Sequence, residues 1–196
     1  MDDRASKRFP QAALVFYATR DGQSRRIATR VADRLVAYGI AAAAHDLRDG
    51  LPTGAELGGA ALVVLIAAVR YGRHLPEAMR LLARYRNLSR RPPVALASVN
   101  LTARKPDKRT PDNNPYLRKL IAYCGNKPVL AAAFAGRLDY PRYRWLDRQI
   151  IRGIMLLTGG PTDTRTCVVY TSWDAVDEFA MRLADLNLLE RLITPA

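Results

Sequence analysis

The chain has 196 residues, of which 49% are hydrophobic, and it carries a formal net charge of +13. This length and composition exclude a wholly disordered chain and predict one globular domain with a full core. The charge indicates an anionic partner, which is nucleic acid, an acidic lipid surface or a polyanionic substrate.

Residues 1–11 are polar and charged. They lack the apolar segment of a signal peptide, and we expect a flexible leader. Residues 12–190 are expected to form the single domain. No stretch approaches the roughly twenty apolar residues of a membrane-spanning helix. Cys124 and Cys167 have no metal-ligand spacing, so we expect a reducing cytosolic environment and no metal site.

The run Ala12–Ala18 predicts a strand that is covered on both faces of a sheet. A helix is predicted at Ser24–Tyr38, ending at Gly39. The turn between strand and helix is rich in hydroxyl and small side chains, which predicts an anion site at the helix start. It is neither a P-loop nor a three-glycine dinucleotide turn. The residues expected to hold the anion are Thr19, Arg20, Asp21, Gly22, Gln23 and Ser24. The alternative is an ordinary strand–helix turn in which Ser24 caps the helix.

The rest of the chain alternates strands with helices. The expected strands are Ile40–Ala44, Ala61–Ala67, Val94–Val99 and Val129–Ala135, and the expected helices are Leu75–Tyr85 and Pro115–Tyr123. This alternation predicts an α/β fold with a parallel sheet and helices on both faces. A long insert at 137–165 then separates Val129–Ala135 from a second β-like run, Cys167–Thr171. A fifth strand split in this way is typical of long-chain flavodoxin-like proteins.

The last helix is predicted at Ser172–Leu186. Its apolar side chains recur at helical spacing and are expected to form one buried stripe. These side chains are Val176, Phe179, Leu183 and Leu186.

In an open α/β sheet, ligands bind beyond the carboxyl ends of the strands. The loop after the third strand contains Val69, Arg70, Tyr71 and Gly72. Tyr71 is suited to stack on a flavin ring, although a half-buried loop aromatic is the alternative. In the same loop, His74 is a weaker candidate for a general base, because it can equally stabilise the start of the next helix.

The loop after the fourth strand begins with Val99, Asn100 and Leu101 and continues into a basic stretch. The Asn100 amide is expected to reach the pyrimidine edge of a flavin. The cations Arg104, Lys105 and Arg109 form a predicted rim for an anionic substrate, unless the loop is simply solvated.

The insert contains a basic amphipathic helix with aromatic residues at its start. The residues predicted to share its apolar face are Tyr143, Leu146, Ile150, Ile154 and Leu157. The residues expected to contact substrate or an anionic membrane are Arg142, Arg144, Trp145, Arg148 and Arg152. Such helices bind membrane surfaces or partners, but packing of the apolar face against the domain gives the same period.

Several of these stretches together resemble the bacterial quinone-dependent protoporphyrinogen IX dehydrogenases. The resemblance rests on Thr19–Gln23, Arg70-Tyr71-Gly72, Val99-Asn100-Leu101, Ala103–Pro106, Tyr140–Trp145, Gly159-Gly160 and Thr162–Arg165. It covers about Leu14 to Leu186. It implies a flavodoxin-like doubly wound sheet of five parallel strands in the order 2-1-3-4-5, with FMN as cofactor.

The resemblance also implies oxidation of protoporphyrinogen IX to protoporphyrin IX in haem synthesis, with menaquinone or ubiquinone as acceptor. The protein would then lie peripherally on the cytoplasmic side of the bacterial inner membrane. No catalytic acid or base is identified from the sequence. The alternatives are a flavodoxin-type NAD(P)H:quinone reductase and an FMN electron carrier. Ordinary flavodoxins are acidic, so the net charge of +13 argues against the carrier. Nucleic-acid binding is not expected, because no recognised motif accompanies the charge.

Overall fold

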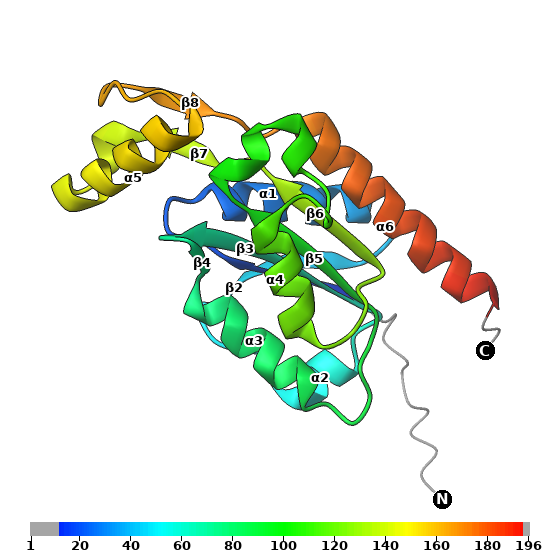
Figure 1. The fold of residues 1–196 in the computed structure, drawn as a ribbon. Helices are drawn as coiled ribbons and strands as arrows, with labels where there is room; N and C mark the ends of the chain where they lie inside the picture. Colours follow the sequence, from blue (N-terminus) through cyan, green and yellow to red (C-terminus); the bar gives the residue numbers. More distant parts are fainter. Residues whose placement is uncertain (1–11, 194–196) are drawn as a thin grey trace, which may run out of the picture.

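The structure, a computed structural model, describes residues 12–193 (Figure 1). The predicted leader at 1–11 lies outside the described residues. The main sheet has the parallel order β2-β1-β3-β5-β6, which confirms the predicted order of the five parallel strands. These strands are β1 (Ala13–Ala18), β2 (Ala42–Asp46), β3 (Leu62–Arg70), β5 (Val94–Val99) and β6 (Leu130–Phe134).

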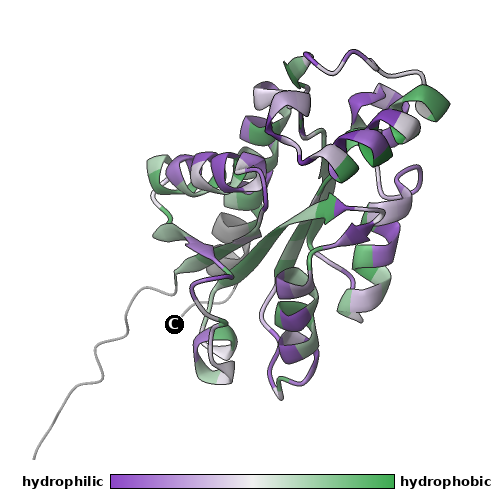
Figure 2. Cartoon of the chain, turned by 90° about the vertical axis from the view of Figure 1, so that its left-hand side faces the viewer, coloured by the Kyte–Doolittle hydropathy of each residue, from purple (hydrophilic) through white to green (hydrophobic). Residues whose placement is uncertain are grey.

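Helices cover the sheet on both faces. They are α1 (Gln23–Ala37), α2 (Gly54–Gly58), α3 (Pro76–Arg86), α4 (Pro115–Cys124) and α6 (Trp173–Ile193). One core contains buried side chains of α1 and α6, and the other contains buried side chains of α3 and α4. In Figure 2 the strands are mainly hydrophobic, while hydrophilic and hydrophobic residues alternate along the helices. The continuous apolar strands and the amphipathic helices therefore form the three layers that their patterns predict.

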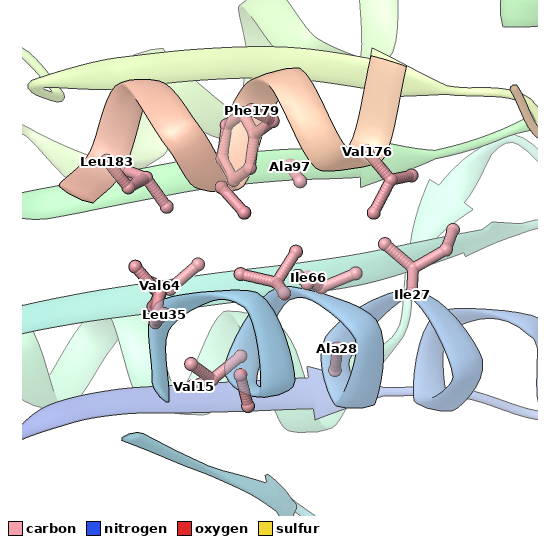
Figure 3. Close-up of a cluster of buried hydrophobic side chains, with 14 of the residues drawn as sticks. Val15, Ile27, Ala28, Leu35, Val64, Ile66, Ala97, Val176, Phe179 and Leu183 are labelled. Atoms are coloured by element: carbon pink, nitrogen blue, oxygen red, sulfur yellow. The ribbon is translucent and has the colours of Figure 1, made fainter. Parts of the chain in front are cut away.

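The central strand β3 contributes alternate side chains to the two cores. Val64 and Ile66 face α1 and α6, whereas Val63 and Leu65 face the other layer. Figure 3 shows the first of these cores, where Phe179 of α6 lies over the sheet. All four β3 side chains are essentially inaccessible to solvent.

The predicted stripe of the last helix is partly wrong. Val176, Phe179 and Leu183 are buried, but Leu186 is 37% exposed. The helix α6 packs against β6 and α1, and β6 begins at Leu130. The C-terminal part of α6 therefore extends beyond the residues that bury its earlier turns.

The insert forms a separate unit at one end of the sheet (Figure 1). It consists of β7 (Arg137–Asp139), the 3-10 turn Tyr140–Arg142, and α5 (Trp145–Thr158). The strand β8 (Cys167–Val169) pairs antiparallel with β7 rather than joining the main sheet. The second β-like run is therefore half of a two-stranded ribbon. The physical reason is that the chain leaves the sheet after β6 and returns along its own path, as the bond from Tyr170 N–H to the Gly136 carbonyl at 3.1 Å shows.

Two further elements did not follow from the sequence pattern. The helix α2 is a single short turn, capped by a reciprocal pair of bonds between Thr53 and Glu56. The strand β4 (Arg73–His74) pairs antiparallel with the end of β3 and lies within a segment predicted as a loop.

Candidate functional site

The turn between β1 and α1 has the geometry of an anion site. Gly22 is the N-cap of α1 with φ of 82°, and the helix begins at Gln23 rather than at Ser24. The Gly22 N–H donates to the Thr19 hydroxyl at 3.0 Å, which fixes the turn. Since Gly22 has no side chain and nothing lies within 4 Å of the position of a Cβ, the backbone is open to a ligand. The first N–H groups of such a helix have no partner within it.

Ser24 does not cap the helix, so the alternative assigned to it is wrong. It lies in the first turn and is 1% exposed, and its Oγ has no hydrogen-bond partner. The Oε1 of Gln23 is also buried without a partner. Buried polar atoms are normally hydrogen-bonded, and unpaired ones indicate a missing ligand or water. A phosphate at this turn would satisfy the Ser24 hydroxyl and the free helix N–H groups, so the residues fit the predicted phosphate of FMN.

The Gln23 side chain also connects the turn to the return path of the insert. Its Nε2 donates to the Thr171 hydroxyl at 2.8 Å, and that hydroxyl donates to the Ala135 carbonyl at 2.6 Å. Both bonds are buried. The anion turn and the point where the insert joins the sheet are therefore held together.

A tight hairpin presents Tyr71 at the same edge of the sheet. Strands β3 and β4 are joined by Tyr71 and Gly72, whose φ angles are 50° and 75°. A two-residue turn with positive φ at both positions matches the twist of a hairpin. Positive φ is uncommon for a tyrosine, and such conformations concentrate at functional sites. The Tyr71 side chain is 52% exposed, so it is available for a ligand.

Asn100 follows β5 and belongs to a buried polar network. Its Oδ1 accepts from the Ala103 N–H at 3.1 Å and from Asn114 Nδ2 at 3.2 Å. Its Nδ2 donates to the Ser98 hydroxyl at 3.0 Å. The amide therefore shapes the loop after β5, and it would reach a flavin edge only by exchanging these partners.

His74 lies behind this network rather than in the cleft. Its Nε2 shares a hydrogen bond with the Ser98 Oγ at 2.9 Å. Burial lowers the pKa of His74 to about 4, so the ring is neutral near pH 7. The general-base role considered for His74 has no support from this position.

These loops surround one cleft of about 920 Å³, a volume that includes its open mouth. All the predicted cofactor residues line it except Gly22, which lies in the turn itself. Lining residues that were not predicted as cofactor contacts are Ala68, Thr102, Tyr116, Gly136, Arg137, Tyr143, Ile151 and Ile154. A cleft lined by loops at the carboxyl ends of parallel strands is a common binding site for a cofactor or a small molecule. That the lining residues contact FMN stays a prediction.

The insert closes one side of the cleft. Tyr143, Ile151 and Ile154 line it, and Tyr143 is buried with Tyr140, Leu138 and Met155 in a small separate core. Burial raises the pKa of the Tyr143 phenol, whose oxygen accepts from the Asp139 N–H at 3.2 Å.

Arg70 joins the insert to the loops of the cleft. Its Nη1 donates to Asp21 at 3.0 Å, and its Nη2 donates to Asp147 at 2.6 Å. The Tyr71 hydroxyl donates to the same Asp147, in the first turn of α5. Bonds from Tyr71 and Arg70 lower the pKa of the Asp147 carboxyl. Asp147 was not singled out from the sequence, because no local pattern links it to residues 76 or 77 positions away.

None of the cations predicted to contact substrate or membrane lines the cleft. Arg104 donates to the Leu101 carbonyl at 3.1 Å, and Arg109 donates to the Ala103 carbonyl at 3.1 Å. These bonds hold the loop after β5, and Arg109 borders a different hollow beside β6. Lys105, Arg142, Arg144, Trp145 and Arg152 are exposed, whereas Arg148 is half-buried. The arginines that do line the cleft are Arg20, Arg70 and Arg137.

Most of the predicted apolar face of α5 lies in solvent. Leu146 is 66% exposed and Leu157 is 88% exposed, while Tyr143 is buried. The helix packs instead through Met155 and Ile151. Together, Trp145, Leu146, Ile150, Leu156 and Leu157 form the exposed apolar surface of α5, and the partly exposed Ile154 also lines the cleft. Packing against the domain therefore does not explain this face. No helix within residues 12–193 is long and apolar enough to cross a membrane.

Comparisons with known proteins agree with this architecture. A family model described as a flavodoxin domain matches residues 14–165. A protein named protoporphyrinogen IX dehydrogenase (quinone) from Escherichia coli K12 is 40% identical over 177 residues, covering 89% of this chain and 95% of that protein. A protein of the same name from Leishmania major is 38% identical over 176 residues, covering 89% of this chain and 75% of that protein. The structure of oxidised Flavodoxin 2 from Bacillus cereus matches with a TM-score of 0.52 at 16% identity, over 89% of this chain and 99% of that one. At that identity the structural likeness shows the fold alone.

Proposed function

This chain belongs to the quinone-type protoporphyrinogen IX dehydrogenases, a family of flavodoxin-domain oxidoreductases, and from that membership we propose its reaction. The proposed reaction is the oxidation of protoporphyrinogen IX to protoporphyrin IX, with FMN as cofactor and a membrane quinone as electron acceptor. The observation that carries the proposal is 40% identity across 89% of the chain to a protein of that name. The proposed place of the reaction is haem biosynthesis.

The turn at Thr19–Ser24 is the proposed site of the FMN phosphate. The free N–H groups of α1 and the unpaired Ser24 hydroxyl would bind it. Gly22 leaves room for close approach of the backbone. The flavin supplies the redox chemistry when bound, and the protein binds, orients and shields the reactants.

The hairpin turn and the loop after β5 are the proposed walls of the flavin ring site. Tyr71 is exposed, and it lines the cleft together with Asn100 and Leu101. Apolar side chains of the insert, Ile151 and Ile154, would exclude water from the remaining side. With His74 neutral and hydrogen-bonded behind the sheet edge, we assign no catalytic acid or base to this chain.

The exposed apolar surface of α5 is the proposed contact with the membrane that carries the quinone. It combines Trp145 and large aliphatic side chains with the exposed cations Arg144 and Arg152. Helices of this composition lie in the interface of anionic bilayers. Each cation near such a surface contributes about 1 kcal/mol. The proposed location is the cytoplasmic side of the inner membrane, where the protein would be peripherally bound.

The reaction is tested with purified protein under anaerobic conditions. FMN should bind in titration, and protoporphyrin IX should form only when a quinone is added. Failure to bind FMN would overturn the assignment. Turnover driven by NADH in place of porphyrinogen would favour a NAD(P)H:quinone reductase instead.

The membrane contact is tested with liposomes that contain anionic lipid. Joint substitution of Arg144 and Arg152 by Gln should weaken binding about tenfold or more, on the scale of about 1 kcal/mol per cation. Arg118→Gln with Lys119→Gln on α4 is a control of equal charge change, and it should leave the binding largely unaltered. Equal effects of the two pairs would mean that general charge, rather than α5, attracts the membrane.

A further inference from the structure

The guanidinium of Arg70 carries one positive charge and binds two carboxylates, although a single carboxylate would neutralise that charge. Its Nη1 and Nη2 each donate to a different aspartate, Asp21 at 3.0 Å and Asp147 at 2.6 Å. The group of three side chains is therefore net −1, inside a chain whose net charge is +13. The second carboxylate comes from the insert, and the Tyr71 hydroxyl holds it as well.

The surroundings of the Arg70 guanidinium also suit the binding of a planar carboxylate. It lies 5.2 Å from the ring centroid of Tyr71 and 5.8 Å from that of Tyr143. Its side chain is 19% exposed, and it lines the cleft with both tyrosines. A partly desolvated guanidinium oriented by aromatic rings binds carboxylates strongly and with fixed geometry.

We propose that Arg70 is the receptor for a propionate of the tetrapyrrole, and that Asp147 occupies this receptor until the substrate displaces it. This inference rests on the proposed function, because it names how that substrate is recognised. The entering propionate accepts from the Arg70 Nη2 in place of Asp147, so that charge is conserved at the guanidinium.

The exchange has a mechanical consequence for the insert. Asp147 lies in the first turn of α5, two residues after Trp145. The Asp147 carboxylate contacts the end of β3 and the turn that follows it through the ion pair to Arg70 and the bond from Tyr71. Release of Asp147 therefore loosens the start of α5 when substrate binds, next to the exposed apolar surface.

The first experiment measures the dissociation constant of protoporphyrin IX, which keeps both propionates, by absorbance titration. Arg70→Gln should weaken binding by about ten- to a hundredfold, since bonds to charged groups are the strong ones. Asp147→Asn should instead tighten binding by about threefold or more, because a neutral amide competes less well than a carboxylate. The matched control is Asp163→Asn, also in the insert, which pairs with Arg165 rather than with the cleft and should change nothing.

The opposite changes in porphyrin affinity expected for Arg70→Gln and Asp147→Asn distinguish substrate recognition by Arg70 from a purely structural role of the ion pair. If Asp147 only positions α5, removal of either partner loosens the same contact, and both variants weaken binding. That result would overturn the proposal. Tyr71→Phe is a milder variant that keeps Arg70 and removes one bond to Asp147, and it should tighten binding slightly. It preserves the test should Asp147→Asn fold poorly.

Two further readouts complete the test. The dimethyl ester of protoporphyrin IX lacks both carboxylates, so its affinity should not respond to Asp147→Asn. Hydrogen exchange of the amides at 148–151, the first to bond within α5, should accelerate when protoporphyrin IX is added to the wild-type protein, and not when the ester is added. Unchanged exchange with bound porphyrin would contradict the release of Asp147. A wild-type protein that binds the porphyrin but oxidises no porphyrinogen would overturn the proposed function and leave the receptor standing.

Discussion

In the main sheet, β3 is covered by helices on both faces, whereas in the insert α5 leaves most of its large apolar side chains in solvent. Both regions are rich in large apolar residues, although β3 is a continuous apolar run and α5 is amphipathic. They differ in what surrounds them, because the sheet is one continuous packed body and the insert has only a small core around Tyr140 and Met155. Most of the buried apolar contacts that stabilise the fold therefore lie in the sheet and its helices, while the insert exposes surface for contacts with other molecules.

The largest expected effect is on the free energy of unfolding, when the same Ile→Ala substitution is made in β3 and in α5. Ile66→Ala, at a fully buried position of β3, should lower the free energy of unfolding by about 2–5 kcal/mol. Ile150→Ala, at a position of α5 that is 48% exposed, should lower it by less than about 0.5 kcal/mol. The free energies of unfolding of the two variants are measured by urea denaturation. Equal losses would show that α5 belongs to the same cooperative core.

The half-buried His74 gives the sheet edge a distinctive pH dependence. Its pKa is lowered by burial from 6.5 to about 4, so the unfolded chain binds the proton more tightly. Its contribution to stability is therefore complete above about pH 6.5 and is lost as the pH falls toward 4, by up to about 3 kcal/mol.

This slope is measured by chemical denaturation between pH 7 and 4. His74→Gln should remove it, whereas His45→Gln, at an exposed position of β2, should retain it. A slope that survives in His74→Gln would assign the pH dependence to other groups.

The Ser24 hydroxyl should matter for the ligand and not for the fold. Ser24→Ala removes a buried Oγ that has no partner, so the melting temperature of the apoprotein should stay the same or rise slightly. Affinity for FMN should fall by about tenfold or more, the value expected for a bond to a charged group. Ser89→Ala, at an exposed loop position, is the matched control for the FMN titration. An unaltered FMN affinity in Ser24→Ala would remove the hydroxyl from the phosphate site.

The smallest expected effect is on stability, from an ion-pair cluster that joins the helices α1 and α6. Asp177 of α6 pairs with Arg30 at 2.7 Å and Arg34 at 2.6 Å of α1, and these bonds hold its pKa well below the usual range. Its contribution is present above the unfolded pKa of about 3.9 and is lost as the pH falls below it. Asp177→Asn should thus lower the melting temperature slightly at pH 7.

The same substitution at pH 3 should cost less than it does at pH 7. Asp174→Asn, one turn earlier on α6 and exposed, is the matched control. Should the cost of Asp177→Asn be independent of pH, the ion pairs would not be its cause.

Much of the sheet was predictable because local pattern determines it. Strands such as β3 and β5 are uninterrupted apolar runs, whereas their order in the sheet was correctly predicted from the family resemblance. The loops that line the cleft were also located, since the carboxyl ends of parallel strands meet at one edge.

What was missed depends on contacts between distant residues. The positive φ of Tyr71, which makes β4 part of a hairpin, is not a preference of tyrosine and cannot be read from its identity. Helical period identified an apolar face on α5, but the period is the same whether the face packs or not, and the structure leaves Leu146 and Leu157 exposed. Asp147 carries no local signal, because its partners lie on β3 and in the turn that follows it.

The bonds at the base of the insert have a consequence for how this fold can change over evolutionary time. The Ala135 carbonyl accepts from Thr171 and the Gly136 carbonyl from Tyr170, so the excursion departs and returns at adjacent points. Material between those points can lengthen, shorten or be replaced without shifting the strands on either side. Mutations in the insert can thus change the molecules that the protein contacts, while the turn beside Gln23 keeps its conformation.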